Sequence, residues 1–196
     1  MRYVSLGTLA HDYTSSYCFI KHDPDELDKR SYKIARGFEL TAHDAPLPLR
    51  VHMSEDHPGM ELADRVANSC NLLIVSKTLQ TALAAVNKGP AQYLPVEIYN
   101  HKNRLASADY FVVNPIGTVD ALNLKASSIK WFEGDVVSVD KIVLDPAKLK
   151  AAPDLFRVKE DPYTYVVSEN ILTAWRSIVP KPTNVVFRTL EQSEGD

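Results

Sequence analysis

Two stretches of the chain share one pattern of hydrophobic and polar positions. The first runs from Leu72 to Ile98 and the second from Tyr165 to Arg188. Each reads as an apolar strand, a serine, one amphipathic helix, a proline and a second apolar strand. Ser76 and Ser168 are 92 positions apart (168 − 76). The pattern suggests an internal duplication of a strand–helix–strand unit, and the alternative is that two periodic segments match by chance.

The helix in each stretch follows from the spacing of its apolar residues. Pro90 and Pro182, which end the two helical segments, are also 92 positions apart (182 − 90). A serine directly after a strand can accept a hydrogen bond from a free backbone N–H, so we expect Ser76 and Ser168 to cap the helices. The apolar positions recur at i, i+3, i+4 and i+7, which places them on one helical face: Leu79, Ala82, Leu83 and Val86 in the first helix, and Ile171, Ala174, Trp175 and Ile178 in the second.

The first third of the chain predicts shorter elements. Two tyrosine-rich segments, Tyr3–Leu9 and Tyr17–Lys21, read as strands that could pair as a hairpin. Asp23 and Pro24 are typical of a helix start, and the helix would continue to about Arg30. The proline-rich segment 42–59 reads as a surface loop with one short strand at 49–53, and a short helix is expected over 62–70.

The remaining segments are mostly strands. We expect strands at 109–114, 128–132, 136–144 and 154–158. The second and third are separated by Glu133, Gly134 and Asp135, whose glycine suits a tight turn, so they should form a hairpin. The returning strand of the first repeat contains Pro95, which favours a position at a sheet edge.

These elements predict an α+β fold with a mixed or mostly antiparallel sheet and helices packed on it. The length of 196 residues suits one domain over 1–196, within which an N-terminal part (1–105) and a C-terminal part (106–190) could be distinguished. The polar and acidic segment 191–196 has nothing to bury and is expected to fray.

Composition narrows the class of function. Twenty-five acidic residues against 22 basic ones give a formal charge of −3, and the basic residues form no stripe, which argues against nucleic-acid binding. No apolar run approaches the roughly 20 residues that span a bilayer, and the first residues lack the apolar core of a signal peptide. Cys18 and Cys70 stand outside any C-x-x-C pattern. We therefore expect a cytoplasmic protein with no membrane partner.

Histidines and aspartates in the proline-rich loop offer the main chemical alternative. His52, Asp56 and His57, with His43 and Asp44 nearby, could hold zinc or serve a small hydrolase. Their spacing lacks the i, i+4 helical face of a zinc-protease motif, and a solvated loop explains them more simply. The chain also lacks a G-x-S-x-G elbow and a glycine-rich phosphate loop. We therefore expect no enzymatic activity, no metal and no cofactor.

Five short motifs together resemble a bacterial protein family. They occur in the family's order between about Asp64 and Arg188, and the resemblance is weaker over the first sixty residues. The family comprises the immunity proteins of polymorphic toxin systems, typified by a myxobacterial member and formerly catalogued as a domain of unknown function. The motifs are LIVSKTL at 73–79, YLPV at 93–96, YFVVNP at 110–115, VDALN at 119–123 and LFRV at 155–158.

The resemblance implies a cytoplasmic protein that binds and neutralises a cognate toxin, encoded by a neighbouring gene, without catalysis. An enzyme that uses the loop histidines and a regulatory protein-interaction module are the alternatives. If the toxin is a nuclease with a basic cleft, acidic side chains could complement it. The oligomeric state stays open. The expected partner-binding residues are Glu55, Asp56, Glu61 and Asp64.

Overall fold

The computed structural model describes residues 2–9 and 16–194. Its α-helices are α1 (Ser31–Ala35), α2 (Lys77–Val86) and α3 (Glu169–Arg176), and short 3-10 helices span Asp28–Arg30 and Lys148–Ala151. The strands of the largest sheet are β2 (Phe19–Ile20), β3 (Leu49–His52), β4 (Arg65–Asn68), β5 (Leu73–Ser76), β6 (Ala91–Tyr99) and β7 (Leu105–Pro115). A second sheet contains β1 (Tyr3–Gly7), β11 (Leu155–Arg157), β12 (Tyr165–Ser168) and β13 (Val186–Thr189). Two strand pairs complete the fold: β8 (Ser128–Phe132) with β9 (Asp135–Lys141), and β10 (Val143–Leu144) with β14 (Glu191–Gln192).

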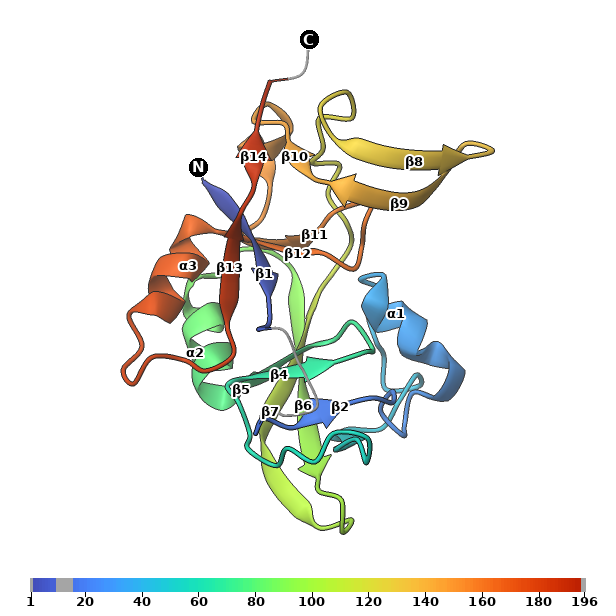
Figure 1. Cartoon of the computed structure of the whole chain (residues 1–196), viewed down its shortest axis with the longest axis vertical. Coiled ribbons are helices and arrows are strands. Elements are labelled where there is room, and N and C mark those ends of the chain that lie inside the picture. The colour runs from blue at the N-terminus through green and yellow to red at the C-terminus, as the bar shows by residue number, and fades with distance from the viewer. Residues whose placement is uncertain (1, 10–15, 195–196) are drawn as a thin grey trace.

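The two main sheets contain the same four-stranded arrangement (Figure 1). The first sheet has the order β2-β4-β5-β7-β6-β3 and the second has the order β11-β12-β1-β13. β4-β5-β7-β6 therefore corresponds to β11-β12-β1-β13, and every neighbouring pair in both sets is antiparallel. The hydroxyls of Tyr110 on β7 and Tyr3 on β1 also donate to carbonyls shortly before β4 and β11, those of Ala63 and Ala152. The N-terminal strand thus completes the second unit in the place that β7 occupies in the first.

A carboxylate begins each unit and binds the serine that precedes its helix; Asp154 is buried, whereas Asp64 is half-buried. Ser76 Oγ donates to Asp64 at 2.8 Å, and Ser168 Oγ donates to Asp154 at 2.6 Å. Ser76 also caps α2, since its Oγ accepts from the N–H of Leu79 at 3.4 Å. Ser168 makes no such bond, so the prediction that it caps α3 through its side chain is wrong. Its hydroxyl is engaged by the carboxylate instead.

Three hydrophobic clusters hold the sheets together. The central cluster receives side chains from α2, from α3 and from one face of each main sheet, so the two helices lie side by side against both units (Figure 1). The other face of the first sheet packs against the segment from Cys18 to Met53, and the other face of the second packs against residues between Val119 and Ala152. The fold is α+β with mixed and antiparallel sheets, as the sequence predicted.

Several element predictions are wrong because pairing over long sequence distances decides them. β1 and β2 do not form a hairpin: β1 pairs with β12 and β13, whereas β2 pairs in parallel with β4. The segment expected to form a helix over 62–70 contains the strand β4. Pro24 does not open an α-helix, since the first α-helix begins at Ser31. Pro95 lies in a strand flanked by β7 and β3, although pairing with β3 begins only at Val96.

The end of the chain also differs from expectation. Residues 191–194 are not frayed, because β14 pairs in parallel with β10 and the carbonyls of Ser193 and Glu194 accept from Asn123. Residues 195 and 196 lie outside the described part. The suggested division at 105/106 does not follow the sheets, since β7 belongs to the first sheet and β1 to the second.

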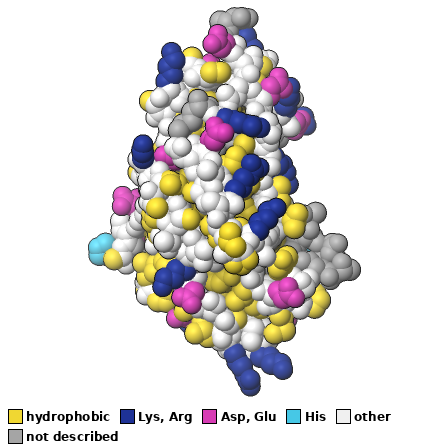
Figure 2. Space-filling view, turned by 90° about the vertical axis from the view of Figure 1, so that its left-hand side faces the viewer, with side chains coloured by type: hydrophobic (Ala, Val, Ile, Leu, Met, Phe, Trp, Pro, Cys, Tyr) yellow, Lys and Arg dark blue, Asp and Glu magenta, His cyan; other side chains and the backbone are white. Residues whose placement is uncertain are grey.

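Figure 2 shows the face that carries α2 and α3. Lys and Arg side chains stand singly on it, with Asp, Glu and hydrophobic side chains between them. In the described ranges, no helix has both the length and the apolar character needed to cross a membrane.

Candidate functional site

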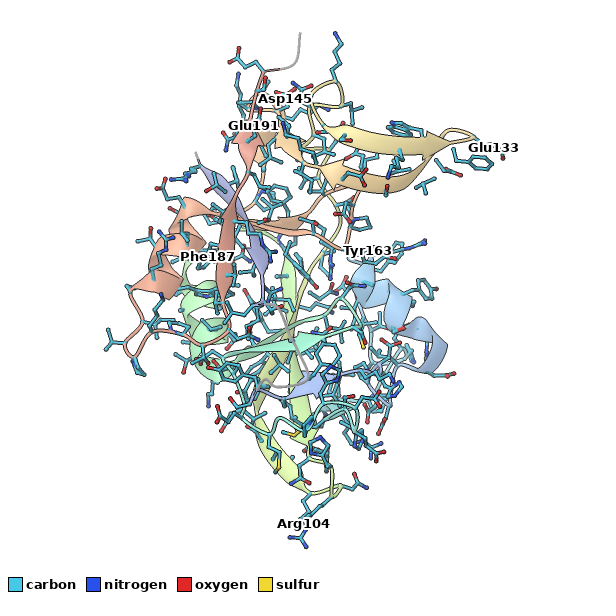
Figure 3. The ribbon with its side chains drawn as sticks, in the orientation of Figure 1. Arg104, Glu133, Asp145, Tyr163, Phe187 and Glu191 are labelled. Carbon is cyan, nitrogen blue, oxygen red and sulfur yellow. The ribbon has the colours of Figure 1, made fainter. Side chains whose placement is uncertain are left out.

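The β8–β9 hairpin extends away from the two main sheets (Figure 1). Its turn matches the sequence prediction: Glu133 and Gly134 have φ values of 51° and 91°, the conformation that a two-residue hairpin turn requires. Figure 3 shows Glu133 at the tip of the hairpin. Within residues 2–9 and 16–194, neither strand pairs with a third strand, so the hairpin presents both of its edges and most of its surface to solvent.

The hairpin exposes large apolar side chains. Trp131 is 52% exposed, Phe132 is 66% exposed and Val137 is 65% exposed. Leaving such side chains in water forfeits about 1.5–3 kcal/mol each relative to burial. A group of them on one projecting element is typical of a surface that binds another protein, where aromatic residues are enriched.

A groove runs between this hairpin and the body of the protein. It has a volume of about 890 Å³ and is bordered by the end of α1, by the segment around Leu124 and by the turn at 159–163. Phe38 and Tyr163, both about half exposed, add to its apolar lining together with Leu124. Figure 3 shows Tyr163 between the hairpin and α1. Trp131 and Val137 line this groove and Phe132 is not among its lining residues, so part of the exposed apolar surface of the hairpin continues into a concave surface.

The groove has an acidic margin. Its charged lining residues are the basic Arg36 and Lys159 and the acidic Asp120, Asp135, Glu160 and Asp161. Asp120 forms an ion pair with Lys148 at 2.7 Å, and Lys148 is not among the residues that line the groove. Within residues 2–9 and 16–194, the buried Glu160 Oε2 has no hydrogen-bond partner. The acidic residues outnumber the basic ones in this lining, so the groove favours a partner that carries positive charge.

The acidic residues predicted to bind a partner do not line this groove, and their exposure and contacts differ from one another. Glu55 and Asp56 are exposed and line a separate cavity of about 570 Å³ together with His52 and His101. Asp56 forms an ion pair with Lys21, and the hydrogen bond from that lysine lowers the pKa of the carboxyl group.

The other two predicted residues are engaged within the protein. Glu61 is exposed and accepts a hydrogen bond from Ser16 Oγ at 2.9 Å. Asp64 accepts from Ser76 Oγ, from the Thr183 N–H at 2.9 Å and from the Thr183 hydroxyl at 3.0 Å. Asp64 therefore joins the first helix start to the second unit, and its carboxylate is already occupied.

The loop histidines point to structural roles. His52 Nε2 lies 3.1 Å from Asp25, and His101 Nε2 is 2.9 Å from the carbonyl of Ser54. The ring of His57 lies against that of Phe19, with the ring centroids 4.6 Å apart. In the described part of the chain, no three histidine, cysteine, aspartate or glutamate side chains are placed to hold a metal ion.

The two thiols are unsuited to nucleophilic chemistry. Cys18 is buried in the first core and Cys70 is half-buried, and both are free. Burial raises the pKa of each thiol to about 12, so neither forms the reactive thiolate at neutral pH.

Sequence reasoning found the hairpin but not its exposure. The available signal was the adjacent pair Trp131 and Phe132 just before a tight turn, because alternation places two consecutive strand residues on opposite faces. At least one of these rings must then face away from any single core. A free hairpin exposes both.

Comparison with known proteins identifies the chain's family. A search of curated proteins found no match. The model of one family, described as the immunity protein family Imm11, matches residues 9–192. That match covers every named helix and strand except β1, and it agrees with the resemblance seen in the sequence motifs. The chain belongs to the Imm11 immunity protein family.

Proposed function

We propose that this protein acts in the cytoplasm as a non-catalytic inhibitor of a bacterial toxin encoded by a neighbouring gene. Membership of an immunity protein family supports toxin neutralisation as the general role. The free state of both thiols and the structural contacts of His52, His57 and His101 support a role without chemistry.

The single observation that carries the proposed binding mode is the groove beside the β8–β9 hairpin. Its apolar lining suits an apolar element of the toxin, and its acidic margin suits basic side chains on either side of that element. We therefore infer that the toxin inserts an apolar segment flanked by basic residues.

The test uses the toxin domain encoded beside this gene, co-expressed and purified with the full chain. The double variant Trp131→Ala/Tyr163→Ala removes two exposed aromatic side chains that line the groove. It should weaken binding by at least about 30-fold, because removing central aromatic contacts of an interface costs about 2 kcal/mol or more. Leu105→Ala is the matched control, since Leu105 is 52% exposed and lies next to Arg104 at the opposite end of the molecule (Figure 3). Equal affinities for the two variants would refute the groove as the binding site.

The acidic loop is the competing surface, and it predicts a different result. If Glu55, Asp56 and Glu61 steer a basic toxin, their combined change to lysine should slow association most strongly at low salt. Asp64 is left unchanged in this variant because its carboxylate holds the helix start. An association rate that is unaffected by the triple reversal would remove this loop from the interface.

A further inference from the structure

A buried arginine lies where the two main sheets meet. Arg65 begins β4 and is paired with Val75, a residue of the central core that both units share. Its backbone donates to the Thr183 carbonyl at 3.3 Å and accepts from Asn184 Nδ2 at 2.9 Å. The side chain is only 8% exposed. The guanidinium is therefore held at the junction of the two units and is largely withdrawn from water.

This guanidinium has no anionic partner. Over residues 2–9 and 16–194 it forms no ion pair and its side chain makes no hydrogen bond, and Arg65 Nη1 is buried without an acceptor. Burial lowers the pKa of Arg65 to about 10, a value to which Tyr165 contributes by raising it and Arg188 by lowering it, so the group stays cationic at neutral pH. A buried cation without a counter-charge costs several kcal/mol, and an apolar residue would avoid that cost.

Arg65 lines a small polar cavity. The cavity has a volume of about 100 Å³, and Thr8, Asn68, Asn71 and Tyr165 contribute to its wall. Tyr165 is buried and its hydroxyl accepts from Arg157 Nη2 at 2.6 Å while donating to the carbonyl of Asn71.

The surroundings of the cavity are also cationic. Arg157 is fully buried and lies over the Tyr165 ring at 4.2 Å, and its Nε has no acceptor. Arg188 contributes positive charge from β13. Among the described residues, no carboxylate lines the cavity. The site thus gathers positive charge and unused donors around a space that would hold about three water molecules at ~30 Å³ each.

We propose that this cavity binds a small free oxyanion, of the size of phosphate or sulfate, through the guanidinium of Arg65. A guanidinium is a strong hydrogen-bond donor to such an anion, and the negative charge of the anion would neutralise the buried cation. The volume excludes a nucleotide or a peptide segment. Because the cavity is built from β4, β12 and the end of β1, a bound anion would stabilise the junction between the two units.

The test measures thermal unfolding of the full chain, dialysed free of oxyanions, against increasing phosphate with chloride holding the ionic strength constant. Phosphate should stabilise the wild-type protein in a saturable way. The equilibrium constant for unfolding should fall about 100-fold when phosphate reaches 100 times its dissociation constant. Arg65→Met should show only the weak, non-saturating effect that phosphate has on any folded protein. Arg104→Met, which removes an exposed arginine, should respond like wild type.

Calorimetric titration of wild type with phosphate and then with sulfate keeps the proposal falsifiable if Arg65→Met fails to fold. Saturable binding of one anion per chain, weakened in Tyr165→Phe, is the expected result. The absence of saturable binding of either anion to wild type would overturn the proposal, as would identical titrations for wild type and Arg65→Met.

Discussion

At the residue scale, two aspartates, Asp64 and Asp154, bind the two units to each other. Asp154 lies before β11 and accepts from Ser168 Oγ and Asn170 Nδ2 in its own unit, and from the Lys88 N–H after the helix of the other. Asp64, in the first unit, likewise contacts the other unit, since it accepts hydrogen bonds from Thr183, which follows α3. The serine after each strand therefore has a role besides helix capping, because its hydroxyl donates a hydrogen bond to an aspartate carboxylate.

Asp154 should make stability depend on pH. Burial raises its pKa, but the hydrogen bonds from Ser168, Asn170 and Lys88 outweigh burial and leave the pKa below its usual value. A carboxyl group with a lowered pKa in the folded state stabilises the fold above its unfolded pKa of about 3.9, and that stability is lost as pH falls through the folded value. Asp154→Asn should cost about 2 kcal/mol at pH 7 and progressively less below pH 4.

Urea unfolding of wild type and Asp154→Asn from pH 7 to pH 2.5 measures this effect. Asp140→Asn serves as the control, because the pKa of Asp140 is also lowered, by the hydrogen bond from Lys130, but its side chain is half exposed and the pair lies on the surface. A constant difference between wild type and Asp154→Asn at all pH values would contradict the role assigned to the carboxylate.

Truncation of the two tryptophans should change the free energy of unfolding by very different amounts. Trp175 is 1% exposed, and its Nε1 donates to the carbonyl of Leu79 at 3.1 Å. Trp175→Ala should therefore lower the free energy of unfolding by about 3–5 kcal/mol. Trp131→Ala should change it by no more than about 0.5 kcal/mol, because that ring is exposed. Denaturant unfolding of both variants is the measurement, and similar losses would contradict the assignment of the two rings to core and surface.

At the element scale, the helices and the hairpin differ in how they are stabilised. α2 and α3 bury one face each in the central core, whereas the β8–β9 hairpin relies on its own pairing and on a few partly buried residues such as Ile129 and Val139. A two-stranded hairpin is marginal by itself. Its turn should therefore control how well the exposed aromatic residues are presented to a partner.

Gly134→Ala should destabilise the β8–β9 hairpin without destabilising the two main sheets. Gly134 has φ of 91°, which an alanine adopts at a cost of about 1 kcal/mol or more. Amide hydrogen exchange in β8 and β9 should accelerate about 5-fold, with little change in the two main sheets. Glu133→Asn is the opposing control, because asparagine tolerates the φ of 51° at that position better than glutamate does. Equal acceleration across all sheets would show that the hairpin does not open independently.

At the scale of the whole molecule, the N-terminal strand β1 belongs to the second unit. β1 pairs with both β12 and β13, so it joins the two ends of that unit, and its residues Tyr3, Val4 and Leu6 are buried. The first unit takes the corresponding strand, β7, from directly after β6. One unit is therefore continuous in sequence, and the other is completed by a strand from the opposite end of the chain.

Deleting residues 1–8 should destabilise the protein by about 5 kcal/mol or more, because three large buried side chains and a central strand are lost. A synthetic peptide of residues 1–9, added in excess, should restore cooperative unfolding. Circular dichroism melts of the truncated chain with and without the peptide test this. The same peptide with Val4 and Leu6 changed to serine is the control, and a truncated chain as stable as wild type would refute the assignment of β1.

The sequence alone determined the elements whose signals are local. Apolar spacing places α2 and α3 correctly, the Glu133–Gly134 turn identifies the hairpin, and ordered motifs lead to the immunity family. Each of these depends on residues within a few turns or strands of one another. The acidic residues Glu55, Asp56, Glu61 and Asp64 could be selected by charge, but sequence could not show that Asp64 is occupied inside the fold.

Only the tertiary structure decided what depends on long-range pairing. It places β1 between β12 and β13, makes 65–68 a strand of the first sheet and leaves Trp131 and Phe132 exposed. It also encloses Arg65 without a counter-charge from the described part of the chain. The physical reason is that periodicity shows which residues seek burial, while the partner that covers them is set by contacts between segments far apart in the chain.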